Sequence, residues 1–117
     1  MSIKLNLVVI QSSNLENSVS FYQNFGLVFH KEQHGNGPVH FACEIENIVF
    51  EIYPSSTGRV DMGTRIGFNV IDLNQIVDTL RVKGYAIISE PKVSPWGKRA
   101  VVQDPDGHKV ELLEVET

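Results

Sequence analysis

Two glutamates stand out because each interrupts an apolar run at an alternate position. Glu51 lies between Phe50 and Ile52, and Glu111 lies within Val110-Glu111-Leu112. Successive side chains of a strand point to opposite faces, so the apolar neighbours are expected to pack inward and the glutamates to face the other side. Carboxylates in such positions can bind a metal ion or pair with a cation.

A cation is available on a third segment. In residues 64–71 the alternate apolar side chains form a packing face, which turns Arg65 toward the side of the glutamates. The chain repeats with an offset of 58 residues, as between Asn14 and Asp72, so the counterpart of Arg65 is Leu7. We therefore expect four residues on the floor of a cleft: Leu7, Glu51, Arg65 and Glu111. Tyr53 is expected on the same face, either to orient a polar ligand through its hydroxyl or to fill the cleft.

The repeat also defines the elements that must position these residues. Asn14 and Asp72 are N-cap residue types, and the helical apolar patterns that follow them end at Gly26 and Gly84. Each helical segment is preceded by one strand-like run and followed by three, which makes two βαβββ modules. The pattern predicts an α+β fold in which two modules form a curved mixed sheet around a cleft. A single domain is expected, with module 1 at about 1–54, a linker at about 55–63 and module 2 at about 64–117.

The expected boundaries follow from the apolar periods and the turn residues. Helices are predicted at residues 14–25 and 72–83, and strands at 3–11, 27–33, 39–44, 47–53, 64–71, 85–90, 98–103 and 109–115. The last two strands are joined by Asp104-Pro105-Asp106-Gly107, which is typical of a β-turn. Residues 3–11 are apolar on both faces, so both faces are expected to be covered.

Composition excludes several classes of function. The chain has 117 residues and a net charge of −4, without a Lys/Arg cluster, so neither nucleic acid nor an anionic membrane is an expected partner. The one cysteine, Cys43, cannot form an internal disulfide and is expected to be a buried, inert thiol. We find neither a secretory leader pattern nor an apolar run of about 20 residues, and we expect a cytoplasmic protein.

Two motifs resemble those of the vicinal oxygen chelate superfamily, which includes glyoxalase I, extradiol dioxygenases and the fosfomycin- and bleomycin-resistance proteins. One runs from Asn14 to Tyr22 and leads to Gly26-Leu27, and the other runs from Gln103 to Leu112. The resemblance implies the glyoxalase/bleomycin-resistance/dihydroxybiphenyl dioxygenase-like fold. In metal-dependent members a divalent cation is held by His, Gln or Glu from the first, fourth, fifth and eighth strands.

Those four places here are the ones already identified: Leu7, Glu51, Arg65 and Glu111. Leu7 offers no lone pair and Arg65 is a permanent cation, so we expect the metal site to be lost, with Glu51 and Glu111 as its vestiges. Arg65 is instead expected to neutralise the two glutamates. We predict no cofactor and no catalytic residue. A competing interpretation lets histidines replace the missing ligands: His40 from a strand, or His34 and His108, which are expected in loop or surface positions.

A further run, Ser94-Pro95-Trp96-Gly97-Lys98-Arg99, is similar to the segment of bleomycin-resistance proteins that places a Trp at the mouth of the ligand groove. Trp96 can stack on an aromatic or heteroaromatic ligand, or it can cap the edge of the core. The prediction is a metal-free protein that binds a small, aromatic or heterocyclic molecule through Trp96, Tyr53, Arg65, Glu51, Glu111 and Leu7. Relatives are commonly dimers, which implies a homodimer.

Two alternatives remain open. One is a lyase, isomerase or dioxygenase that depends on a divalent metal such as Zn, Ni, Mn or Fe and uses Glu51 and Glu111 as ligands. The other is a subunit or regulatory module whose own side chains fill the cleft. The sequence leaves open the ligand, any reaction, the pairing of modules in a dimer and the pathway.

Overall fold

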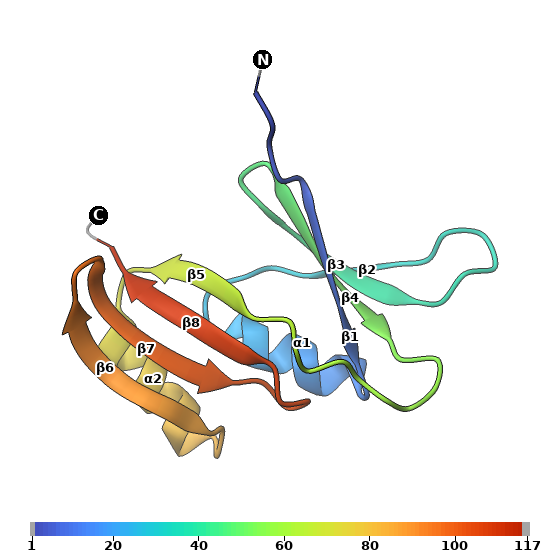
Figure 1. The fold of residues 1–117 in the computed structure, drawn as a ribbon. Coiled ribbons are helices and arrows are strands. Elements are labelled where there is room, and N and C mark those ends of the chain that lie inside the picture. Colours follow the sequence, from blue (N-terminus) through green and yellow to red (C-terminus); the bar gives the residue numbers. More distant parts are fainter. Residues whose placement is uncertain (1, 116–117) are drawn as a thin grey trace. The chain divides into compact units, whose positions relative to one another are not determined.

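A computed structural model describes residues 2–115 and divides the chain into two compact units, residues 1–60 and 61–117. Residues 1, 116 and 117 of the expected modules lie outside the described residues. Each unit consists of one strand, one helix and three further strands (Figure 1). Among the described residues, no helix is long and apolar enough to cross a membrane.

The first unit is a four-stranded mixed sheet with one helix. Its strands lie in the order β1-β4-β3-β2, where β1 and β4 are parallel and the other neighbours are antiparallel. The elements are β1 (Leu7–Ser12), α1 (Leu15–Gln23), β2 (His30–Glu32), β3 (His40–Ile45) and β4 (Ile48–Pro54).

The second unit repeats this arrangement. Its strands lie in the order β5-β8-β7-β6, with β5 parallel to β8 and antiparallel pairing elsewhere. The elements are β5 (Ile66–Val70), α2 (Leu73–Val82), β6 (Ile87–Ser94), β7 (Gly97–Gln103) and β8 (Lys109–Glu114).

The register of the two sheets confirms that the glutamates are equivalent. Val9 of β1 pairs with Glu51, and Gly67 of β5 pairs with Glu111. Val9 and Gly67 are separated by the 58-residue offset of the repeat. The predicted α+β fold with two βαβββ modules is thus confirmed, whereas the shared cleft and the single domain stay predictions.

Strand alternation places the core where the apolar period predicts it. Phe50 and Ile52 are buried under α1, and Val110 and Leu112 are buried under α2. The helices contribute Phe21, Tyr22, Leu73, Val77 and Leu80, all at most 1% exposed. Burial of such side chains is the main stabilising term of each unit. The opposite faces of β4 and β8 are therefore left to carry Glu51 and Glu111.

The two helices begin differently although both start at an N-cap residue type. The Asn14 side chain accepts a hydrogen bond of 3.1 Å from the Asn17 N–H, whereas Asp72 makes no side-chain cap. Instead, the Glu114 carboxylate of β8 accepts a hydrogen bond of 3.0 Å from the Leu73 N–H. The first cap is local and the second is tertiary.

Two expected strand boundaries, one in β1 and one in β6, are wrong. β1 begins at Leu7 rather than at residue 3, because its partner β4 begins only at Ile48. The expected cover on both faces of β1 stays a prediction, and in the single chain Leu7 is 48% exposed. β6 continues past Pro91 to Ser94, because register shifts on this outer strand tolerate a proline that a central strand would exclude.

Candidate functional site

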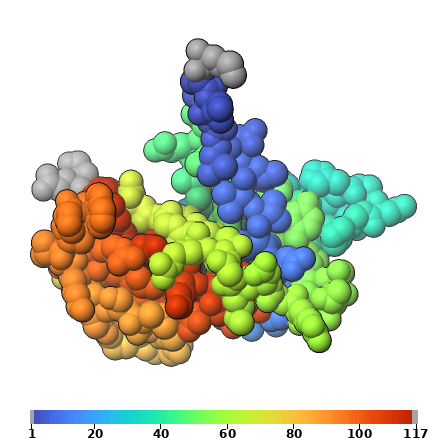
Figure 2. Space-filling model, in the orientation of Figure 1, coloured from blue at the N-terminus to red at the C-terminus, as the bar shows by residue number. Residues whose placement is uncertain are grey.

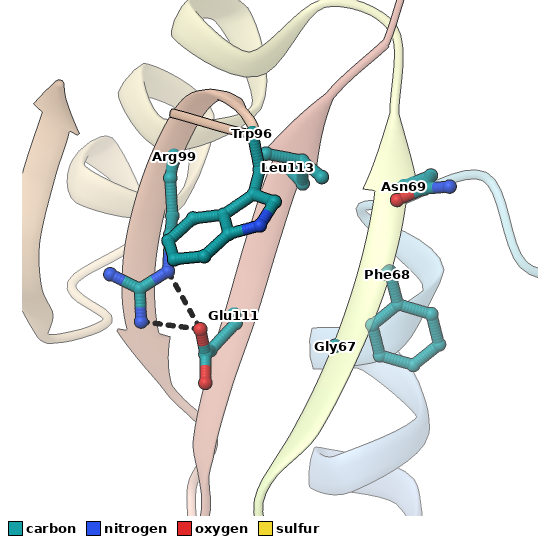
Figure 3. A pocket seen from close by; sticks show the side chains of 7 residues that line it. All are labelled: Gly67, Phe68, Asn69, Trp96, Arg99, Glu111 and Leu113. Carbon is teal, nitrogen blue, oxygen red and sulfur yellow. Dashed lines mark hydrogen bonds and ion pairs between the residues drawn. The ribbon is translucent and has the colours of Figure 1, made fainter. Parts of the chain in front are cut away.

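The second unit carries a groove on the face of its sheet opposite to the core. Its volume is about 710 Å³, and it is lined by Gly67, Phe68, Asn69, Trp96, Arg99, Glu111 and Leu113 (Figure 3). The register explains the gathering of these residues, because Gly67 pairs with Glu111 and Arg99 pairs with Leu113. Gly67 has no side chain, so the floor beside Glu111 stays open.

Trp96 lies at the tip of the hairpin that joins β6 and β7. Ser94 pairs with Gly97, which leaves Pro95 and Trp96 as a two-residue turn, and Gly97 has a φ of 128° that favours glycine. Trp96 is 77% exposed, and its indole lies beside the Arg99, Glu111 and Leu113 side chains (Figure 3). The expected loop position is thus confirmed, and the exposed ring does not fill the core.

Glu111 is surrounded by arginines on the floor of this groove. Its Oε1 accepts a hydrogen bond of 2.7 Å from the Arg99 Nε–H and a second one from Nη2 of the same guanidinium. Its Oε2 lies 3.4 Å from Nη1 of Arg65. The predicted pairing of Arg65 with Glu111 is therefore present, and Arg99 makes the stronger, forked contact.

This arrangement does not fit a divalent cation at the places where the resemblance implies one. Both oxygens of Glu111 already interact with guanidinium groups, which cannot lose a proton and would repel an ion. The Leu7 side chain has no donor atom. We therefore assign no catalytic step to a metal at Glu111.

Arg99 is the functional candidate that the sequence analysis left without a role. The alternation of side chains along the strand could have indicated this role. In the expected strand 98–103, Arg99 alternates with Ala100 and therefore faces the same side as Glu111 on the neighbouring strand. Which carboxylate it meets depends on the register of β7 and β8, which a single sequence does not supply.

In the first unit, Glu51 meets a histidine rather than an arginine. Oε2 of Glu51 lies 3.6 Å from Nε2 of His40, whose ring is 1% exposed. Tyr53 stacks on that ring with centroids 4.1 Å apart and an interplanar angle of 8°. Partial burial raises the pKa of the Tyr53 hydroxyl, and the charges of Glu51 and Glu32 add to the rise. Leu7 remains half-exposed and makes no polar contact.

His108 lies in a loop, as expected, but it is buried rather than at the surface. His108 is 1% exposed, its Nδ1 lies 2.8 Å from Oδ2 of Asp104, and its Nε2 lies 2.9 Å from the Asp61 carbonyl oxygen. The hydrogen bond with Asp104 raises the pKa of His108 despite the opposing effect of burial. Both acceptors require an N–H, so the ring is held as an imidazolium. The hydrogen bond from the Gly107 N–H to the Asp104 carbonyl confirms the predicted turn. His108 stabilises this turn through its contact with Asp104.

Cys43 behaves as predicted. Its side chain is buried on β3, and burial raises the pKa of the thiol, which favours the unreactive protonated form. We assign it no chemical role.

Comparison with known proteins identifies the family. The Glyoxalase/Bleomycin resistance protein/Dioxygenase superfamily matches residues 4–112. A lactoylglutathione lyase of Arabidopsis thaliana is 29% identical over 92% of this chain. The chain spans 42% of that protein's length. A protein of Synechocystis named "Probable lactoylglutathione lyase" is 29% identical, with 91% of each chain covered.

Solved structures show the same fold. An antibiotic binding protein from Streptomyces sp. CB03234, TnmS3, superposes with a TM-score of 0.74 and 22% identity, covering 97% of this chain and 98% of its own. At this identity the likeness concerns the fold.

Proposed function

Because this chain belongs to the glyoxalase/bleomycin resistance/dioxygenase superfamily, we propose that it binds a small aromatic or heterocyclic molecule in the groove beside Trp96, without a catalytic metal. The observation that carries the proposal is the exposed indole above a floor formed by Arg99 and Glu111. A flat ring stacked on Trp96 would exclude water from the indole face.

Size and chemistry of the groove support this class of ligand. Small-molecule sites occupy roughly 300–1,000 Å³ and combine apolar walls with few polar groups, and the groove of about 710 Å³ matches both features. Leu113 offers an apolar contact, whereas Asn69 offers a donor and an acceptor for polar substituents. That TnmS3 is an antibiotic binding protein is consistent with planar antibiotics as the first compounds to test.

A fluorescence titration can test this proposal, because the chain contains a single tryptophan. Trp96 is the one tryptophan, so the intrinsic fluorescence excited in the indole band reports this position alone. We expect a planar antibiotic or metabolite that binds to quench this emission in a saturable titration. A ligand at about 100 times its dissociation constant should also stabilise the protein by about 2.7 kcal/mol in thermal unfolding.

Matched variants locate the site. Trp96→Ala should weaken a hit at least tenfold by isothermal titration calorimetry, because the stacking surface is removed. Val93→Ala removes an apolar side chain that is 87% exposed on the same hairpin but does not line the groove, and it should leave affinity unchanged. Equal affinity of the wild type and Trp96→Ala would place the ligand elsewhere and contradict the proposal.

The names of the relatives favour a second candidate, a lyase. For such an enzyme the family resemblance implies a divalent metal, with Glu51 and Glu111 as ligands. Under this alternative, lactoylglutathione lyase activity depends on added divalent metal, and Glu111→Gln abolishes both metal binding and turnover. We expect instead no turnover in the presence of Zn, Ni, Mn or Fe.

We also propose a homodimer. In the first sheet β1 is an outer strand, and the nearby apolar residues Leu5, Leu7 and Val9 are 64%, 48% and 45% exposed. A second copy would cover such a surface and protect a sheet edge. Light scattering coupled to size exclusion should give twice the chain mass, and Leu7→Glu should lower it to that of one chain.

A further inference from the structure

We propose that the first unit carries a binding site for a zinc-class divalent cation, formed by Glu32, His34 and His40. One ligand atom from each side chain lies within 4.8 Å of the others. Glu32 ends β2, His40 begins β3, and His34 belongs to the loop between them. None of the three is at a strand position where the family resemblance implies a metal ligand.

The distances suit a tetrahedral ion. Oε1 of Glu32 lies 3.3 Å from Nε2 of His40 and 3.7 Å from Nε2 of His34. Two ligand atoms about 2.1 Å from a zinc ion at the tetrahedral angle are about 3.4 Å apart. Both separations exceed the usual hydrogen-bond length of about 2.9 Å. Both separations from the Glu32 carboxylate are therefore close to the spacing expected around an ion.

His40 supplies an independent observation. Its side chain is 1% exposed, and its Nε2 is buried without a hydrogen-bond partner among the described residues. Its Nδ1 lies 3.2 Å from the Pro38 carbonyl oxygen, which can only accept, so Nδ1 is the donor and Nε2 is the ring nitrogen that faces the cluster. Histidines that bind metals are oriented in this way, by a backbone carbonyl on the other ring nitrogen.

Charge and access also suit a divalent cation. Glu51, with Oε2 3.6 Å from Nε2 of His40, adds a second carboxylate beside Glu32, so two negative charges face the position of the ion. His34 is 74% exposed in its side chain, which opens a path from solvent. Residues 33–39 form a loop that projects from its sheet (Figure 2). The ring nitrogens and carboxylates favour zinc over calcium or magnesium.

The loop is shaped in advance for this role. The Gly37 N–H donates a 2.9 Å hydrogen bond to the His34 carbonyl, and the Gln33 side chain donates one of 2.9 Å to the Gly37 carbonyl. A Cβ at Gly37 would come within 3.0 Å of the His34 carbonyl oxygen. The turn therefore holds the His34 backbone in place before an ion arrives.

The test titrates zinc chloride into full-length protein that was treated with chelator, followed by calorimetry, with cobalt(II) as a spectroscopic probe. We expect one zinc per chain and the visible absorption of four-coordinate cobalt. His34 is exposed, so His34→Ala should leave folding unchanged while it weakens binding at least tenfold. Glu32→Gln should weaken binding by at least the same factor. His30→Ala removes an exposed β2 histidine outside the cluster and is the matched control, with no expected change.

Glu111→Gln separates this proposal from the metal-dependent alternative to the proposed function. Zinc binding that survives in Glu111→Gln and is lost in His34→Ala supports the site on β2, β3 and their loop. Absence of zinc binding in the wild type overturns it, as does binding that persists in both His34→Ala and Glu32→Gln. Because the proposed ligand groove contains none of these histidines, failure of one proposal leaves the other standing.

Discussion

The two units place different basic side chains beside equivalent glutamates. Ala42 pairs with Glu51 on β4, and Val101 pairs with Glu111 on β8, and the residue two positions earlier is His40 in one strand and Arg99 in the other. The guanidinium of Arg99 is permanently charged and grips Glu111. In the first unit, Nε2 of His40 lies 3.6 Å from Oε2 of Glu51. The same strand pairing thus gives a hydrogen-bonded ion pair in one unit and a longer glutamate–histidine contact in the other.

The two units also differ in how well the ring nitrogens of their buried histidines are hydrogen-bonded. Both nitrogens of His108 are hydrogen-bonded, whereas Nε2 of His40 has no hydrogen bond among the described residues. Breaking a satisfied buried ion pair lowers the free energy of unfolding strongly. Removing a buried nitrogen that makes no hydrogen bond lowers it little. The contrast indicates that His108 stabilises the fold, and it agrees with the proposed role of His40 as a ligand of a cation.

The largest expected effect tests this contrast in stability. His108→Phe should lower the free energy of unfolding by about 3 kcal/mol, because Asp104 would be left buried without its cationic partner. His40→Phe keeps a flat ring against Tyr53 and loses the hydrogen bond to the Pro38 carbonyl, so it should lower the free energy of unfolding by only about 1 kcal/mol. Urea denaturation in the presence of chelator measures both. Similar losses in the two variants would contradict the assignment of different roles.

A smaller effect is expected from pH. The pKa of His108 is raised above its ordinary value of 6.5 by Asp104, so the folded state binds the proton more tightly than the unfolded state. The stabilisation is therefore complete below about pH 6.5 and is lost as pH rises through the raised pKa. Urea midpoints of the wild type should decline over this range. His108→Phe should lack that decline, and a parallel pH profile in the variant would refute the linkage.

The helix caps offer a third comparison. Asn14→Ala should cost about 1 kcal/mol, because the Asn17 N–H loses its acceptor. Asp72→Ala should cost only about 0.3 kcal/mol, since the Asp72 side chain accepts no cap hydrogen bond and Glu114 serves the Leu73 N–H. Thermal unfolding of the pair decides between local and tertiary capping. A loss at Asp72 as large as that at Asn14 would show that Glu114 is no substitute.

The smallest effect concerns the arginines. Arg99→Gln should lower the free energy of unfolding by about 0.5 kcal/mol, because its pair with Glu111 is partly exposed and screened by water. Arg65→Gln should change it by about 0.2 kcal/mol, given the longer and more exposed contact. Raising the salt concentration should reduce both differences. An order reversed between the two variants would show that Arg65 is the principal partner of Glu111.

Much of the fold followed from local pattern. Alternation placed Phe50 and Val110 in the core and turned Glu51 and Glu111 away from it, because side-chain direction in a strand has a period of two. The repeat predicted two modules of equal topology, which the sheet orders confirm. The ends of β1 and β6 were missed, because partner strands and bulges set them.

The sequence by itself determined which residues carry charge, which faces are apolar and where Trp96 sits in a turn, since these follow from residue type and local period. Only the tertiary structure decided that Arg99 grips Glu111, that His108 is buried against Asp104, and that Glu32, His34 and His40 converge. These side-chain contacts depend on the register of the strands and on the conformation of the loops. These are settled by the packing of the whole unit rather than by any one segment.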